Sequence, residues 1–132
     1  MFIFMNALDQ AIIHALQAEG ATSTANKAYL EFIKANFIIP IHSDPTHEEP
    51  HVLYLEENNQ YFLPVFTEKE YLSAWANSIE DRIELLMLSG VDLLKGIGEN
   101  VCVSLNIGAP SYKEFNPAEL ARMRSMVLKL FQ

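Results

Sequence analysis

The chain has 132 residues, half of them apolar, which is enough for one hydrophobic core and too few for two domains. Nine Lys and Arg stand against 17 Asp and Glu, and because the formal charge of -8 repels phosphate backbones we expect no nucleic-acid partner. No apolar run approaches the roughly 20 residues of a membrane helix, and Met1–Met5 lacks the basic region of a signal peptide, so we expect a cytoplasmic protein with no membrane partner.

Two helices are predicted at the start of the chain. Asn6 and Asp9 have the spacing of a capping box, in which polar side chains bind the free amides of a helix start. Gly20 marks the end of this first helix, and a second helix is predicted from about Ser23 to Asn36. The apolar face of the first helix consists of Leu8, Ala11, Ile12, Ala15 and Leu16.

Strand-forming composition follows the second helix. Phe37–Ile41 and Val52–Leu55 are both rich in aromatic and aliphatic side chains, which favours two strands. The polar segment Glu56–Gln60 then turns the chain into a further strand that begins at Tyr61. The strands on either side of this segment should therefore form an antiparallel hairpin.

A strand changes into a helix within the segment Tyr61–Ala76. Its first six residues are aromatic, aliphatic or proline, and Pro64, which has no backbone N–H to donate, indicates an edge or early strand position. Thr67 and Glu70 have the spacing of another capping box. The helix that follows has an apolar face for the sheet, and the side chains assigned to the core here are Phe66, Tyr71, Leu72 and Trp75.

Strand, short helix and strand succeed one another in the second half of the chain. Ile83–Leu88 and Val101–Leu105 have strand composition, and Gly90–Ile97 predicts a short helix between them. This order favours parallel pairing of the two strands. Cys102 alternates with two valines, which predicts a buried and unreactive thiol.

A last helix is predicted after Asn116. Asn116 is the expected cap, Pro117 suits the first helical position, and Glu119 stands three residues after the cap. The predicted buried face of this helix consists of Leu120, Met123, Val127 and Leu130.

Several segments resemble one known family. They are Leu63–Thr67 (LPVFT) with the following helix and its Trp75, Ser89–Leu94 (SGVDLL), Val103–Gly108 (VSLNIG) and Asn116–Met123 (NPAELARM). These segments are similar to the N-terminal domain of the enhanced serine sensitivity protein SseB and its relatives, with Ile107 standing where that family usually has proline. The resemblance covers nearly the whole chain. It implies a domain of poorly defined molecular activity, without established catalytic residues.

The predicted fold is a single α+β domain over residues 1–132, with a mixed sheet of about five strands flanked by about five helices. We expect a non-enzymatic binding or regulatory module. The alternative is a small-ligand or metal-binding protein, or an enzyme, that uses one of the sites described next. No catalytic residue is assigned, and no cofactor is expected other than a divalent metal at the first of these sites.

The segment His42–His51 (HSDPTHEEPH) concentrates histidines and carboxylates between two predicted strands. Imidazole and carboxylate are suitable ligands for zinc or another divalent ion. The spacing matches no recognised metal motif, and two prolines among polar residues also fit a solvated loop. The candidate metal ligands are His42, Asp44, His47 and His51.

An acidic tract overlaps this segment, because no Lys or Arg occurs between Lys34 and Lys69. A surface of one sign steers basic partners and discriminates between them. A solvated face that keeps the protein soluble is the simpler interpretation. The candidate partner-binding residues are Asp44, Glu48, Glu49, Glu56 and Glu57.

A third candidate site follows from the predicted topology. If the Tyr61, Ile83 and Val101 strands are parallel, the residues after them meet at one sheet edge, where open α/β sheets bind ligands. Two predicted helix N-termini there would favour an anion or carboxylate, although the same residue types are ordinary caps and turn residues. The candidate ligand-binding residues are Thr67, Ser89, Gly90, Asn106 and Gly108.

Apolar residues also precede the first helix. Phe2, Ile3 and Phe4 either pack on their own domain or are covered by another chain. We therefore expect a protein partner or self-association, with a homodimer formed through this arm or through an exposed sheet edge as one possibility.

Overall fold

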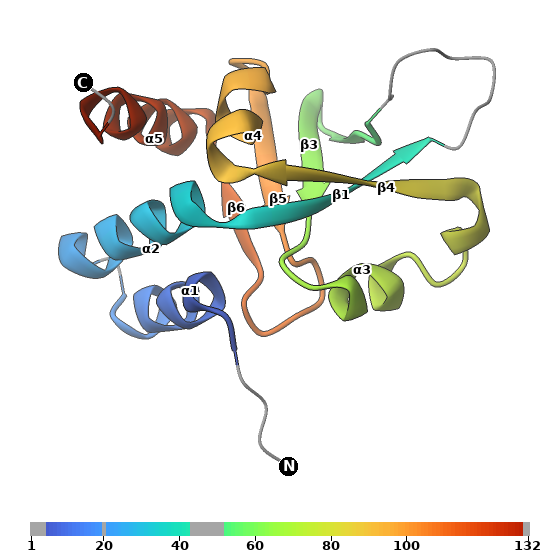
Figure 1. The fold of residues 1–132 in the computed structure, drawn as a ribbon, viewed down its shortest axis with the longest axis horizontal. Helices are drawn as coiled ribbons and strands as arrows, with labels where there is room; N and C mark the ends of the chain where they lie inside the picture. The colour runs from blue at the N-terminus through green and yellow to red at the C-terminus, as the bar shows by residue number, and fades with distance from the viewer. Residues whose placement is uncertain (1–4, 20, 43–51, 131–132) are drawn as a thin grey trace.

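The structure is a computed structural model that describes residues 5–19, 21–42 and 52–130. Figure 1 shows the arrangement of its helices and strands. The helices are α1 (Ala7–Gln17), α2 (Thr22–Lys34), α3 (Lys69–Trp75), α4 (Gly90–Gly96) and α5 (Pro117–Leu130), with a 3-10 turn, η1, at Glu80–Arg82. The strands are β1 (Asn36–His42), β2 (Leu55–Glu57), β3 (Gln60–Val65), β4 (Ile83–Ser89), β5 (Val101–Leu105) and β6 (Lys113–Phe115).

The strands form two sheets. β2, β3, β5 and β6 make a mixed sheet in that order, in which the central pair is parallel and both outer pairs are antiparallel. β1 and β4 make an antiparallel ribbon that crosses in front of this sheet in Figure 1. A bridge between Ile38 and Phe66 joins the ribbon to the chain just beyond β3. The α+β class is confirmed, with six strands in two sheets rather than about five in one.

The position of β4 corrects the predicted topology. β3 and β5 are parallel as expected, but β4 pairs antiparallel with β1 along its whole length and is not beside β5. β5 already has β3 on one side and β6 on the other, so neither of its edges is open to β4. At the end of β4 the N–H of Gly90 donates to the carbonyl of Ala35 at 2.8 Å, which continues the pairing with β1 to the junction of α2 and β1.

The main core lies between the inner face of the four-stranded sheet, the ribbon and helices α1, α2, α4 and α5. Phe32 of α2 is fully buried there, with its ring centroid 4.7 Å from that of Phe37 and 5.0 Å from that of Phe115. Burying one such side chain contributes about 2–3 kcal/mol. Alternation along the strands turns one face to this core, and the sheet residues that line it are Leu63, Val65, Val103, Leu105 and Phe115.

A smaller core, here called the α3 cluster, lies beneath α3. Its buried members are Ile38, Phe66, Leu72 and Ala76. The centroid of the Phe66 ring lies 5.5 Å from that of Trp75. Phe66 and Leu72 are therefore core residues as predicted, whereas Tyr71 and Trp75 pack against the cluster and remain partly exposed.

Two of the predicted helix caps are confirmed. The Asn6 side chain accepts a hydrogen bond from the N–H of Asp9 at 2.8 Å and begins α1. Asn116 and Glu119 form the reciprocal capping box of α5, with each backbone N–H donating to the other side chain, at 2.9 Å and 3.2 Å. In both places the cap and its amide are three residues apart, so local sequence is sufficient to determine the contact.

The predicted capping box at Thr67 is wrong. α3 begins at Lys69, and Glu68 holds the cap position without a capping hydrogen bond to its side chain. The hydroxyl of Thr67 donates instead to the carboxylate of Asp9, at 3.0 Å. A distant tertiary contact has displaced the local one.

The antiparallel hairpin is confirmed, with a shift in its strands. β2 consists of Leu55–Glu57, later than predicted, and Val52 forms only an isolated bridge with Ile41. The turn is the pair Asn58 and Asn59, with φ of 52° and 64°. A two-residue hairpin turn of type I′ requires positive φ at both positions, and Asn adopts this conformation more readily than most residues.

Some boundary predictions fail at helix ends. Leu16 and Leu130 were assigned to buried faces but are 52% and 55% exposed, because the last turns of α1 and α5 extend beyond the core. Asn36 starts β1 instead of ending α2. Cys102 is buried as predicted, and this burial raises the pKa of its thiol. No helix within the described ranges is long and apolar enough to cross a membrane.

Candidate functional sites

Four polar side chains form a hydrogen-bonded group at the ends of β3 and β5, here called the polar cluster: Asp9, Asn106 and Ser111, which are fully buried, and Thr67, which is partly exposed. Because β3 and β5 are parallel, the residues that follow them meet at one edge of the sheet. The backbone N–H of Thr67 donates to Oδ1 of Asn106 at 2.9 Å. The predicted meeting of Thr67 and Asn106 is therefore found in the structure.

Asn106 is the centre of the polar cluster. Its Nδ2 lies 3.0 Å from Asp9 Oδ1, 3.0 Å from Thr67 Oγ1 and 2.9 Å from Ser111 Oγ. Its φ is 53°, a left-handed conformation that is costly for most side chains. Every fully buried side-chain nitrogen and oxygen in the described residues has a hydrogen-bond partner. The groups that a ligand would need are thus already used within the cluster.

Asp9 is the titratable member of the polar cluster and is fully buried. Burial raises the pKa of its carboxyl, opposed by hydrogen bonds from Thr67 and Asn6 and assisted by the nearby charge of Glu68. A shifted carboxyl pKa occurs at catalytic sites and in structural networks alike. Here the carboxyl has no exposed surface for a substrate, which favours the structural role.

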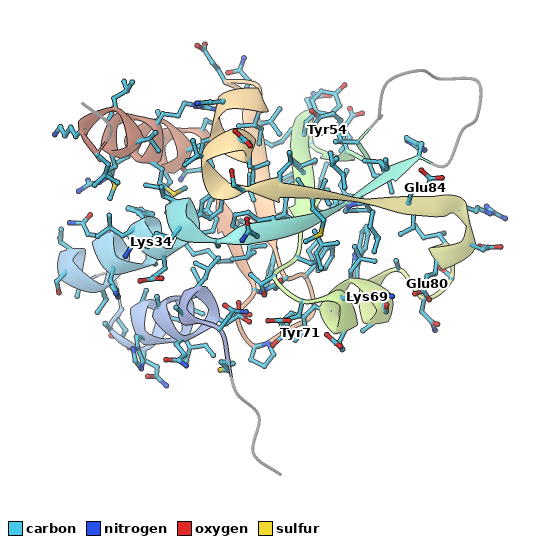
Figure 2. All side chains as sticks on the ribbon, viewed as in Figure 1. Lys34, Tyr54, Lys69, Tyr71, Glu80 and Glu84 are labelled. Atoms are coloured by element: carbon cyan, nitrogen blue, oxygen red, sulfur yellow. The ribbon has the colours of Figure 1, made fainter. Side chains whose placement is uncertain are left out.

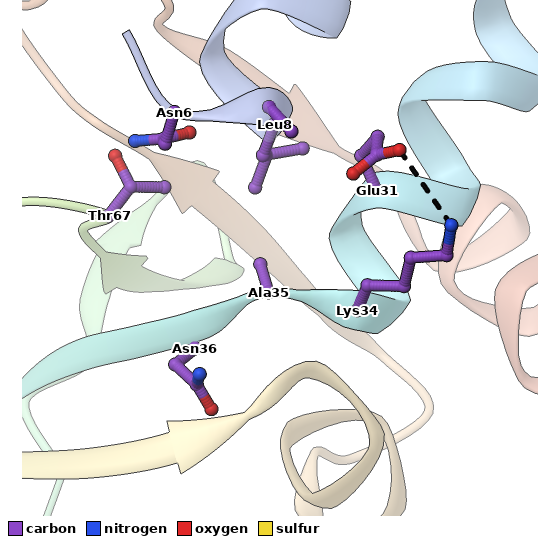
Figure 3. A pocket seen from close by; sticks show the side chains of 8 residues that line it. Asn6, Leu8, Glu31, Lys34, Ala35, Asn36 and Thr67 are labelled. Carbon is purple, nitrogen blue, oxygen red and sulfur yellow. Dashed lines mark ion pairs between the residues drawn. The ribbon is translucent and has the colours of Figure 1, made fainter. Parts of the chain in front are cut away.

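A hollow of about 270 Å³ lies beside the polar cluster, shown in Figure 3. Its single lysine, Lys34, faces Glu31, with 3.9 Å between Nζ and Oε1. Asn6 caps α1 and donates from Nδ2 to Glu68 at 2.9 Å. The ammonium group of Lys34 is therefore paired with Glu31, and the start of α1 is capped by Asn6, so neither is left available for an anionic ligand. The residues that line the hollow are Asn6, Ala7, Leu8, Glu31, Lys34, Ala35, Asn36 and Thr67.

Ser89 and Gly90 lie apart from the polar cluster, at the end of β4. Ser89 caps α4 by accepting from the N–H of Asp92 at 3.1 Å. A Cβ atom on Gly90 would lie 2.1 Å from the carbonyl oxygen of Phe32, so close packing against α2 requires glycine. The structure therefore gives these two residues local roles and does not place them at the predicted sheet edge.

Gly108 lies in the turn after β5, with a φ of 88°. It borders a second hollow of about 340 Å³ between this turn and α3. The walls are mainly apolar and aromatic, consisting of Tyr71, Ala74, Trp75, Ile107, Gly108, Ala109 and Pro110. Gly108 is thus near the end of β5, as predicted, but faces a different hollow from Thr67.

The structure describes one of the four candidate metal ligands. His42 is exposed at the end of β1, whereas Asp44, His47 and His51 lie outside the described residues. Within the described ranges, no three His, Cys, Asp or Glu side chains gather in a way that could hold a metal ion. The metal site in His42–His51 stays a prediction.

The acidic tract is described in part. Glu56 and Glu57 are exposed on β2, and Asp44, Glu48 and Glu49 lie outside the described residues. Across the sheet, the hydroxyl of Tyr112 donates to Glu114 Oε1 at 2.5 Å. Burial, this bond and the charges of Glu114 and Glu57 raise the pKa of Tyr112 to about 12. Glu114 belongs to no acidic run, and only the alternation in Lys113–Phe115 indicates that it faces away from the core.

These side chains surround a shallow groove on the outer face of the four-stranded sheet, here called the outer groove. Leu55 lies opposite Phe62, and Ser104 lies opposite Glu114. The groove has a volume of about 180 Å³. None of its residues belongs to the main core or to the α3 cluster. They are Leu55, Glu56, Glu57, Phe62, Ser104, Ile107, Tyr112 and Glu114.

Comparison with known proteins identifies one family. No curated protein matches the chain. The family described as SseB protein N-terminal domain matches residues 8–122, which span α1 to the middle of α5 and include the polar cluster and the outer groove. The chain therefore belongs to the SseB family, as an N-terminal domain of that family.

Proposed function

We propose that this domain is a non-enzymatic binding or regulatory module that binds a basic, partly apolar protein segment in the outer groove. The observation that supports this proposal is an apolar floor at the surface between carboxylates on both edges of the sheet. Glu57 belongs to β2 and Glu114 to β6, the two outer strands. A bound segment would cross the sheet between them.

The floor of the groove offers contact area. Leu55 is 36% exposed, and Phe62 opposite it is partly exposed although it belongs to a central strand. Removing such surface from water contributes about 25 cal/mol per Å². Covering the two side chains is the hydrophobic component of the proposed binding.

The rim of the groove supplies the charge. Glu56, Glu57 and Glu114 line it together, and Lys113, the neighbour of Glu114, turns to the other face to pair with Glu119 at 3.2 Å. No Lys or Arg lines the groove. Combined with the formal charge of -8, this arrangement steers basic segments and disfavours acidic ones.

The titratable groups in and near the candidate sites support binding rather than catalysis. The pKa values of Tyr71 and Tyr112 are raised still further above neutrality than that of an ordinary tyrosine, so both hydroxyls are protonated at pH 7, and the carboxyl of Asp9 has no exposed surface. A general base needs both an accessible position and a pKa near the working pH. None of these three groups has both.

The test is a charge reversal across the groove. We expect E57K/E114K to bind fluorescent peptides of alternating Lys and Leu at least about tenfold more weakly than the unchanged protein does in 50 mM salt. The control, E70K/E99K, makes the same change in net charge at exposed positions on α3 and after α4, and should lose far less affinity. Fluorescence anisotropy measures both.

A further substitution tests the floor. Phe62→Ser should weaken the same peptides while leaving the salt dependence of binding unchanged, because it removes contact area and no charge. Failure of the unchanged protein to bind any Lys–Leu peptide, or equal losses in both charge variants, would contradict the proposed groove.

A further inference from the structure

We propose that the edge of β4 that pairs with no other described strand is a self-association surface, through which two copies of the chain join their β1–β4 ribbons into one four-stranded antiparallel sheet. This inference uses residues on a different strand from the outer groove and does not depend on it. In Figure 2, Glu84 marks the start of β4 on the side of the molecule opposite Lys34, and the strand runs from there to Ser89, which pairs with Asn36 beside the end of α2.

The direction of the backbone groups in β1 follows from one bridge. Ile38 exchanges both hydrogen bonds with Phe66, at 2.8 Å and 2.9 Å, so its N–H and C=O point away from β4. In an antiparallel pair, hydrogen-bonded and non-hydrogen-bonded positions alternate. Ile38 lies opposite Met87, so Met87 is at a non-hydrogen-bonded position of the ribbon.

By the same alternation, Leu85 is also at a non-hydrogen-bonded position of the ribbon. Leu85 lies opposite Pro40, which has no N–H and whose carbonyl accepts from the N–H of Leu53 at 3.2 Å, away from β4. The backbone N–H and C=O groups of Leu85 and Met87 therefore point out of the ribbon at its open side. In the described part of the chain, no backbone hydrogen bond is made to these groups.

Two large apolar side chains on this strand are exposed. Leu85 is 42% exposed and Met87 is 61% exposed, on the face of the ribbon that also carries Ile38 of the α3 cluster. Natural edge strands commonly carry Lys, Pro or a bulge that blocks pairing with another chain. β4 (IELLMLS) contains a single charge, at Glu84, and neither Lys nor Pro.

The edge is complementary to itself. With a two-fold axis at Leu86, the seven residues of β4 pair with all seven of a second copy, and Leu85 lies opposite Met87 of the second copy at a hydrogen-bonded position. Glu84 then lies opposite Leu88 of the second copy, so no two like charges face each other. Four exposed apolar side chains, two from each copy, would come together on one face.

The geometry also explains why a second copy closes the assembly. The other side of β1 already holds the bridges from Ile38 to Phe66 and from Ile41 to Val52. After two β4 strands pair, the new four-stranded sheet has no further open β4 edge. A two-fold contact of this kind ends at a dimer and does not extend into a filament.

The test combines sedimentation with a charge exchange. The full chain, of 15.0 kDa, is expected to sediment at twice that mass. L85K/M87K and L85E/M87E place like charges opposite each other and should each be monomeric, with dimer dissociation constants raised at least about 100-fold. An equal mixture should form the heterodimer, because each Lys then lies opposite a Glu. L128K/L130K, at exposed positions on α5, is the matched control and should remain dimeric.

A second variant covers the case in which the charged variants do not fold. Met87→Pro removes an outward N–H while leaving the bonds between β4 and β1, and should also yield monomers with an unchanged circular dichroism spectrum. A monomeric wild-type protein at all concentrations overturns the proposal. So does a dimer that survives in every folded β4 variant, or one that is lost only when residues 1–4 are deleted.

Discussion

The polar groups at the borders of the two sheets differ in whether they have hydrogen-bond partners. Where the parallel strands β3 and β5 end, Thr67 and Asn106 bind each other and Asp9, and both Asn106 and Asp9 are fully buried. The open side of β4 instead leaves backbone donors and acceptors without a backbone partner in the described chain, beside exposed Leu85 and Met87. The first arrangement holds the fold together, and the second leaves bonding capacity at the surface.

The difference has an energetic basis. A buried polar group that loses its hydrogen-bond partner lowers the free energy of unfolding by about 1–3 kcal/mol, so removing any one member of the polar cluster should destabilise the fold. Backbone groups at a solvent-exposed strand edge are hydrated and cost the monomer little. Changes in the polar cluster should therefore reduce stability without affecting association, and changes on the outer side of β4 should do the reverse.

The largest expected effect is at the point where the ribbon meets the helices. Gly90→Ala should lower the free energy of unfolding by about 4 kcal/mol or prevent folding, because its Cβ would lie 2.1 Å from one backbone oxygen and 2.8 Å from another. Gly96→Ala, in the same helix with no atom within 4 Å of the added Cβ, should be neutral or slightly stabilising. Urea unfolding measures both. Similar losses in the two variants would show that the close approach to α2 is not what requires glycine.

A smaller loss is expected at the centre of the polar cluster. Asn106→Ala should cost about 3 kcal/mol, because Asp9, Thr67 and Ser111 each lose a partner. Asn106→Gly loses the same bonds but should cost about 1 kcal/mol less, since glycine adopts a φ of 53° without strain. Thermal unfolding of both, with sedimentation at fixed concentration, also tests whether association is independent of the cluster. Equal losses of stability in the two variants would show that the left-handed backbone conformation of residue 106 makes no measurable difference.

The smallest expected effect concerns pH. Burial raises the pKa of the Asp9 carboxyl above its usual value of 3.8, so the folded protein binds this proton more tightly than the unfolded chain does. The resulting stability is fully present below pH 3.8 and is lost as the pH rises through the folded-state value. Asp9→Asn removes this titration, so the unfolding free energy of the wild type minus that of the variant should fall as the pH rises from 3.5 to 7. A difference that rises over this range would mean that the cluster favours the charged carboxylate.

Local signals in the sequence predicted much of the fold. Asn6 and Asn116 cap their helices as expected, because each contact is made within three residues. Thr67 carries the same signal and fails, since Asp9, 58 residues away, takes its hydroxyl. The strand at Ile83 was recognised, but its sheet was not, because pairing depends on segments distant in sequence, with β6 beside β5 and β1 beside β4.

The candidate sites divide in a similar way. Parallel pairing of β3 and β5 correctly predicted that Thr67 and Asn106 meet. Asp9 was recognised only as part of a helix cap, and nothing near it in sequence indicates its bond to Asn106. Glu57 was recognised as a candidate because it belongs to an acidic tract. Glu114 lines the same groove only because of the order of the strands in the sheet, which the sequence did not reveal.

The bond between Asp9 and Asn106 joins positions 97 residues apart in the chain. A ribosome delivers the first of these long before the second, so the helix that carries Asp9 emerges without the amide that completes its burial. Until β5 and the turn after it are released, docking of that helix would bury a carboxyl without its central partner. A fragment that ends before Asn106 therefore lacks both this hydrogen-bond partner and the main-core residues Phe115, Leu120 and Met123.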